Sequence, residues 1–171
     1  DSDDIIIGDS DTAFHADADN NIAIGLNALD ATSGEALYNI GIGTDALTAL
    51  TTGDNNIVLG YAAGDAMTAN SHNIAIGVSA LSGADSDENG NVAIGNEAGA
   101  SINHDDADKN VIIGFSAGTG GGAAMANCVV IGDSAMNSTA ANAQTGTIAI
   151  GSSALTSLTS GVANTVIGYQ A

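Results

Sequence analysis

The chain has 171 residues, of which 44% are hydrophobic but only 3% aromatic, with 23 glycines and no tryptophan or proline. These few bulky side chains favour a thin, repetitive core over the core of a globular domain. Twenty acidic residues stand against the single cation Lys109, so the formal net charge is -19. Without clusters of Lys and Arg the chain would be repelled by nucleic acids and anionic membranes, and these partners are excluded.

A short phrase recurs ten times along the chain, as in Asn21 to Ala28: Asn, three apolar residues, Gly, two variable positions and Ala. Its glycines, called anchor glycines below, lie 17 to 19 residues apart. They are Gly8, Gly25, Gly43, Gly60, Gly77, Gly95, Gly114, Gly132, Gly151 and Gly168. A period of this length is typical of solenoids, in which each repeat forms one coil. We therefore predict an all-β fold, a β-solenoid of about ten coils with one strand per repeat.

The same repeat runs through residues 1–171, which we interpret as one repeat domain. The chain opens on acidic residues and ends at Ala171 inside a repeat phrase, without a polar capping repeat at either end. Because solenoids need such caps, we expect a fragment of a longer fibrous chain. Its apolar runs are too short to span a bilayer, so we expect no membrane insertion in this segment.

The predicted strands are the three residues before each anchor glycine. Their first and third residues are Ile, Val or Leu, apart from Thr165, and share one face of the strand. The middle residue is apolar too, which is typical of parallel sheets covered on both faces. One narrow coil covers only one face, so we predict that the middle residues contact neighbouring copies in a homo-oligomer. These predicted subunit-interface residues are Ala23, Val58, Ala75, Ala93, Ile112, Val130, Ala149 and Val166.

The position four residues before the anchor glycine predicts a structural ladder. It carries Asn21, Asn39, Asn56, Asn73, Asn91, Asn110 and Asn164. Amides stacked at the strand spacing can hydrogen-bond to one another and to the turn backbone, and a ligand-binding amide array is the alternative interpretation. The anchor glycines complete this ladder by allowing a positive φ or a close backbone passage. Cys128 occupies an Asn position, which indicates a small buried thiol.

The second half of each coil is less regular. In residues 46–53 and 154–161 the apolar spacing is compatible with a short helical turn or with a second short strand. Acidic segments such as residues 85–88 and 105–108 are expected to be exposed edge loops. His104, Asp105, Asp106 and Asp108 form the best local candidate for Ca²⁺, which binds oxygen ligands of acidic turns, and a plain solvated loop is the alternative. No other cofactor is predicted.

Three of the five aromatic residues, Tyr61, Phe115 and Tyr169, directly follow an anchor glycine. Leu26 and Val78 occupy the same position in other coils. If this column faces solvent, it is a candidate contact stripe for a receptor or a glycan. Burial between chains is the alternative.

The phrase Asn-[Ile/Val]-Ala-Ile-Gly-x-x-Ala resembles the head repeat of trimeric autotransporter adhesins, the YadA-like β-roll. Its variant at the end of the chain, Ile167 to Ala171, is similar to repeats of bacteriophage tail-fibre proteins. The resemblance implies a left-handed parallel β-roll assembled as a homotrimer about a three-fold axis. It also implies an extracellular location, on a cell or virion surface, and a host-cell or surface receptor as the partner.

The sequence favours a structural attachment fibre and no enzymatic activity. The three histidines fall in separate loops, so no nucleophile, base and oxyanion donors share one predicted pocket. A hexapeptide acyltransferase is one alternative, but it requires an aliphatic residue at every sixth position, where Asp30 and Ala36 follow Ile24. An ice-binding solenoid is another, but its threonines should share one column, and Thr44 and Thr48 do not.

Overall fold

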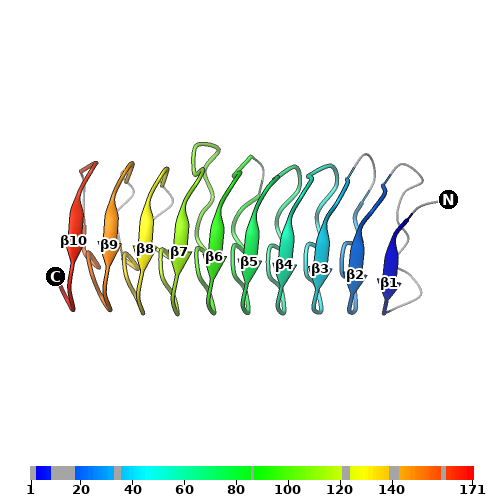
Figure 1. Cartoon of the computed structure of the whole chain (residues 1–171), viewed down its shortest axis with the longest axis horizontal. Helices are drawn as coiled ribbons and strands as arrows, with labels where there is room; N and C mark the ends of the chain where they lie inside the picture. Colours follow the sequence, from blue (N-terminus) through cyan, green and yellow to red (C-terminus); the bar gives the residue numbers. More distant parts are fainter. Residues whose placement is uncertain are drawn as a thin grey trace.

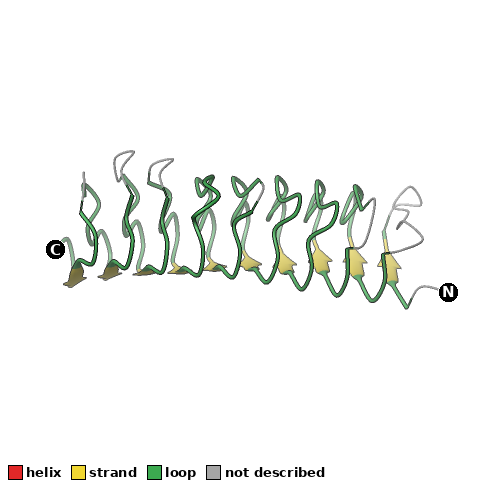
Figure 2. Cartoon of the chain, turned by 90° about the horizontal axis from the view of Figure 1, so that it is seen from above, coloured by secondary structure: helices red, strands yellow, loops and turns green. Residues whose placement is uncertain are grey.

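The computed structural model is a solenoid of ten parallel β-strands in one sheet (Figure 1). It describes residues 3–8, 18–32, 36–85, 87–120, 124–138, 143–158 and 161–171. The strands lie in chain order along the long axis, on one side of the molecule, with the turns on the other (Figure 2). They are β1 (Ile5–Ile7), β2 (Ile22–Ile24), β3 (Ile40–Ile42), β4 (Ile57–Leu59), β5 (Ile74–Ile76), β6 (Val92–Ile94), β7 (Val111–Ile113), β8 (Val129–Ile131), β9 (Ile148–Ile150) and β10 (Thr165–Ile167).

The sequence repeat sets the register of the sheet. Each strand pairs with the next so that equivalent positions of the phrase lie side by side, as in Ile22 with Ile40 and Ile24 with Ile42. Branched aliphatic residues at the first and third positions favour the extended backbone. The prediction of a parallel β-solenoid with one strand per repeat is therefore confirmed.

The strands turn their middle residue, not the two flanking ones, into the coil. Ala23 is 2% exposed, and Val58, Ala75, Ala93, Ile112, Val130 and Ala149 are 0% exposed within the single chain. Our prediction that these residues face another chain is therefore wrong, and Val166, at the same position in β10, is half-buried. The physical reason is that the interior of the coil is narrow. Leu29, Leu47 and Leu81 fill much of it from the opposite turns. This space accepts mostly small residues, and the larger flanking aliphatic residues point outwards.

The second half of each coil forms turns, and the described residues contain no helix and no second strand there. The residue four positions after the anchor glycine has a positive φ of 48° to 63°. Its N–H donates to the carbonyl of an alanine in the next coil, as from Leu47 to Ala63 at 3.1 Å. These bonds replace a second strand ladder, so neither predicted alternative is present.

The anchor glycines are required by close contact between coils. Gly95 has a φ of 137°, and a Cβ there would lie 2.4 Å from the carbonyl oxygen of Gly114. The alanines three residues later, such as Ala98, are fully buried on the inside of the turn. At an anchor glycine, an L-residue would have to adopt an unfavourable backbone angle, and its side chain would clash with the backbone of the next coil.

The interior keeps its volume by exchanging large and small residues between facing positions. Ile112 is the largest inward strand residue, and it faces Gly99 and Gly118, whose added Cβ atoms would lie 3.2 Å and 3.1 Å from it. Conversely, Gly41 leaves room on its strand for Leu29, whose Cγ would lie 3.2 Å from an added Cβ. Large and small residues therefore alternate so that each coil stays close-packed.

Among the residues that the structure describes, no helix is long and apolar enough to cross a membrane.

Candidate functional site

The outer face of the sheet is a continuous apolar surface of the described chain. It is formed by the first and third residues of every strand, and we call these two columns the outer face. Ile57, Leu59 and Ile94 in the middle of the solenoid are 42%, 44% and 36% exposed. The other central members are half-buried against one another. Branched aliphatic side chains thus form an unbroken strip from β1 to β9.

The outer face is long and carries no charge. Nine spacings of about 4.8 Å and strands of about 10 Å give roughly 400 Å². That is within the range of the largest apolar patches found on monomers, about 300 to 600 Å², which are often functional. None of its residues is charged, although the chain carries a net charge of -19. Another apolar surface can therefore pack on it without burying a carboxylate.

The residues directly after the anchor glycines form a second column beside the outer face, and the large apolar members of this column are exposed. Tyr61 and Phe115 are each 57% exposed, and Tyr169 is 74% exposed. Leu26 and Val78, in the same column, are exposed as well. The predicted contact stripe therefore lies at the surface of the single chain. We call this column and the residues that follow it the rim.

The predicted asparagine ladder lies inside the coil, at the start of the strands. Asn21, Asn39, Asn56, Asn73, Asn91 and Asn110 are 0% exposed. The side-chain oxygen of each accepts the backbone N–H of the ladder residue in the next coil, at 2.8 to 3.0 Å. The amide group donates to a carbonyl of the next coil, as from Asn73 to Glu88 at 2.9 Å. These amides are buried and bonded within the chain, which makes them structural rather than a site for a ligand.

Cys128 and Thr147 interrupt the ladder after β7. Both are buried, and the thiol of Cys128 donates to the carbonyl of Gln144 in the next coil. Burial raises the pKa of this thiol, while contacts with backbone groups act in the opposite direction. The thiol is thus kept protonated, which suits packing and not nucleophilic chemistry. Asn164 resumes the column half-buried, with its amide 3.5 Å from the Thr147 hydroxyl.

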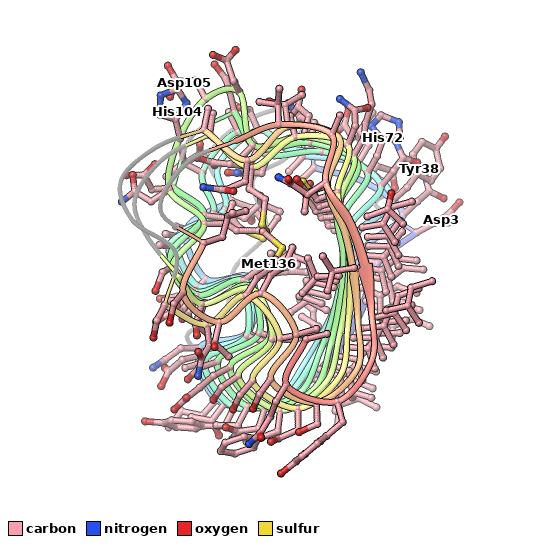
Figure 3. All side chains as sticks on the ribbon, turned by 90° about the vertical axis from the view of Figure 1, so that its left-hand side faces the viewer. Asp3, Tyr38, His72, His104, Asp105 and Met136 are labelled. Atoms are coloured by element: carbon pink, nitrogen blue, oxygen red, sulfur yellow. The ribbon has the colours of Figure 1, made fainter. Side chains whose placement is uncertain are left out.

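The candidate calcium residues do not come together as a ligand set. Within the described ranges, no group of three or more His, Cys, Asp or Glu could hold a metal ion. Nδ1 of His104 accepts the backbone N–H of Asp106 at 3.2 Å, and Asp108 accepts the N–H of Asn89 at 2.7 Å. His104 and Asp105 lie on the outside of the coil, and His72 lies at a different corner of it (Figure 3). His15, the third predicted loop histidine, lies outside the described residues.

One acidic residue of a predicted exposed loop is buried, which the sequence did not indicate. Glu88 is 0% exposed, and its carboxylate accepts from the amide of Asn70 at 2.7 Å. Asn70 and Gln144 occupy the same position of other coils and are buried too. A charge-rich segment gives no signal for this, because only its register against the asparagine ladder places Glu88 inside.

Comparison with protein-family models, with curated proteins and with solved structures finds no match for this chain. The functional interpretation therefore depends on the surfaces described above.

Proposed function

We propose that this chain is a segment of an extracellular attachment fibre, in which three copies pack side by side through their outer faces. The observation that carries the proposal is the uncharged aliphatic strip along the outer face. Each coil fills its own interior with the middle strand residues and the turn leucines, so the flanking aliphatic residues are not needed to fill the interior. Parallel sheets are normally covered on both faces, and a second copy offers the matching surface.

The solenoid geometry suits a fibre. Each added coil lengthens the molecule by one strand spacing without changing the fold. The first and last strands, β1 and β10, lie at opposite ends of the long axis (Figure 1). The three-fold number, the left-handed coil and the surface of a cell or virion come from the resemblance to trimeric adhesin heads and phage fibres. The aliphatic outer face, without a threonine ladder, favours this role over ice binding.

The oligomeric state tests the proposal. We expect the wild-type chain to have the mass of three copies by light scattering after gel filtration, at about 150 mM salt. Ile76→Glu and Ile113→Glu each place a carboxylate on the outer face, where burial without a partner costs several kcal/mol, so they should give single chains. Ser101→Glu adds the same charge to an exposed turn and is the matched control.

Circular dichroism should show that the single-chain variants keep the β-solenoid, because their coils are filled from within. A folded wild-type monomer at about 100 µM would refute the shared outer face. A stable dimer would retain the face but refute the three-fold arrangement.

A further inference from the structure

The rim combines exposed aromatic rings with carboxylates at regular intervals. Tyr61, Phe115 and Tyr169 belong to the coils of β4, β7 and β10, so they recur every third coil. One coil before two of the rings, the second residue after the anchor glycine is acidic, Asp45 before Tyr61 and Glu97 before Phe115. Oδ1 of Asp45 accepts from the side-chain amide of Asn27 at 2.8 Å, which leaves its second oxygen for a ligand. Such pairs of an aromatic face and a carboxylate are suited to Lys and Arg side chains.

The backbone holds the rim in a fixed geometry. The carbonyls of Tyr61 and Phe115 accept the N–H groups of Ser79 and Ser134 in the next coil, both at 2.9 Å. Glu97 accepts the hydroxyl of Ser116, which directly follows Phe115, at 3.0 Å. The rings and carboxylates are therefore anchored to a regular ladder and not to a free loop.

The charge of the chain indicates which kind of ligand the rim can bind. The net charge is -19, and the only cation, Lys109, comes before β7, at the opposite end of the strand from the rim. An anionic ligand would be repelled, whereas a cationic one is attracted by the whole chain and held at the rings. We propose that the rim binds a basic, extended polypeptide, with Lys or Arg side chains on the three rings and the carboxylates of Asp45 and Glu97 beside them. This names a receptor class for the attachment fibre proposed above, and it rests on that role.

The spacing of the rings adds a length requirement. Three strand spacings of about 4.8 Å separate successive rings by about 14 Å. An extended polypeptide advances by about 3.3 Å per residue, so four residues cover nearly the same distance. A peptide with a basic residue at every fourth position can therefore place one cation on each ring.

Synthetic peptides test this requirement. We expect a fluorescent nine-residue Gly/Ser peptide with Arg at its first, fifth and ninth positions to bind the assembled protein. It should bind about tenfold more tightly than the same composition with three adjacent Arg residues, measured by fluorescence anisotropy at about 150 mM salt. The double substitution Tyr61→Leu/Phe115→Leu should weaken the spaced peptide about tenfold, and Leu26 shows that the column accepts leucine.

Matched variants separate the rim from general charge. Asp45→Asn and Glu97→Gln together should weaken binding several-fold, and Asn27 and Gln170 occur at the same rim position. Asp54→Asn and Asp108→Asn together remove the same number of charges at the other end of the strands, and Tyr38→Leu removes an exposed ring there, so these variants should leave the affinity unchanged.

Three outcomes would overturn the inference. Equal affinity for both peptides would mean that only diffuse charge attracts them. Binding of a neutral polysaccharide in place of the peptide, lost in the ring variant, would assign the rim to glycans. Dissociation of the assembly in the ring variant would place the rim inside the subunit contact. The mass measurement tests the fibre itself, so the inference can fail while the assembly stands.

Discussion

The coils of β2 to β7 and those of β8 to β10 share one strand ladder but differ in the side-chain ladder beside it. In the first region six buried asparagines bond from coil to coil without a break. In the second region Cys128, Thr147 and Asn164 occupy the same column. The strands of both regions pair in the same register, and Val130 and Ala149 are as fully buried as Val58 and Ala75.

This difference separates two sources of stability that repeat proteins normally combine. The packed interior and the strand ladder hold each coil against its neighbours in both regions. The amide ladder adds bonds to buried backbone groups, whereas Cys128 offers the buried backbone N–H of Thr147 only its sulfur, a weaker acceptor than an amide oxygen. Because repeat stability is nearly a sum of neighbour terms, we expect the second region to open more readily in hydrogen exchange.

The largest effect is expected where the two regions are alike. Gly95→Ala in the first region and Gly151→Ala in the second put a Cβ 2.4 Å and 2.2 Å from the next anchor carbonyl. Both glycines also have a φ near 135°, which L-residues rarely adopt. Each substitution should cost roughly 3 kcal/mol or more, measured by hydrogen exchange of the adjacent strands. A much smaller cost for Gly151→Ala would mean that the second region already lacks close contact between coils.

The control for this pair is Gly146→Ala. An added Cβ there meets its nearest atom at 4.0 Å, and Ala163 has the equivalent position with a φ of 55°. We expect a loss near 1 kcal/mol, from backbone angle alone.

A reciprocal exchange of ladder residues tests the difference itself. Asn73→Cys removes the acceptor of the Asn91 N–H and the donor to Glu88, so it should destabilise the first region by roughly 2 kcal/mol. Cys128→Asn should stabilise the second by about 1 kcal/mol, because it offers an oxygen to Thr147 and a donor to the carbonyl of Gln144. The backbone at residue 128 already has the geometry of the ladder, since the N–H of Cys128 donates to the side-chain oxygen of Asn110 at 2.9 Å.

Hydrogen exchange of the amide of residue 147 is the direct measurement for this exchange. Cys128→Ser serves as the control, because its hydroxyl is slightly smaller than the thiol and does not extend as far as an amide. If Cys128→Asn slows exchange no more than Cys128→Ser, the gap in the ladder is not what weakens the second region.

The repeat made the sheet predictable, but not which side of it faces inwards. Equal spacing of the glycines sets one strand per coil, and the asparagines mark where each strand begins. Both faces of the strand are apolar, so hydrophobicity alone cannot orient it. Size could have oriented it, because Ala or Gly fills the middle position in five of the ten coils and Ile or Leu precedes every anchor glycine.

The turns were less predictable, because they depend on contacts between coils. Leu47 and Leu81 have positive φ values of 54° and 52°, which leucine rarely adopts. The backbone bonds to the next coil and the burial of the leucine side chains maintain this angle. The pairing of Ile112 with two facing glycines is visible in the sequence only once the register of the coils is known. The same holds for buried Glu88.

The smallest expected effect uses pH to act on one region. Asp65 lies in the turn after β4, and burial raises its pKa above 3.8, with the Asp45 charge adding to this and backbone hydrogen bonds opposing it. The folded chain therefore holds this proton more tightly than the unfolded chain, and stability is lost as pH rises through the window from 3.8 to the raised value. Asp65→Asn should raise Tm at pH 7 by less than about 3 °C and have no such effect below pH 3.8, where the carboxyl is protonated in both states.

Asn137 has the equivalent position after β8, so the amide fits this turn and the second region should be insensitive to the same pH change. Asp30→Asn removes an equal charge from an exposed position of the same column, and a gain as large as that of Asp65→Asn would assign the effect to net charge instead of burial.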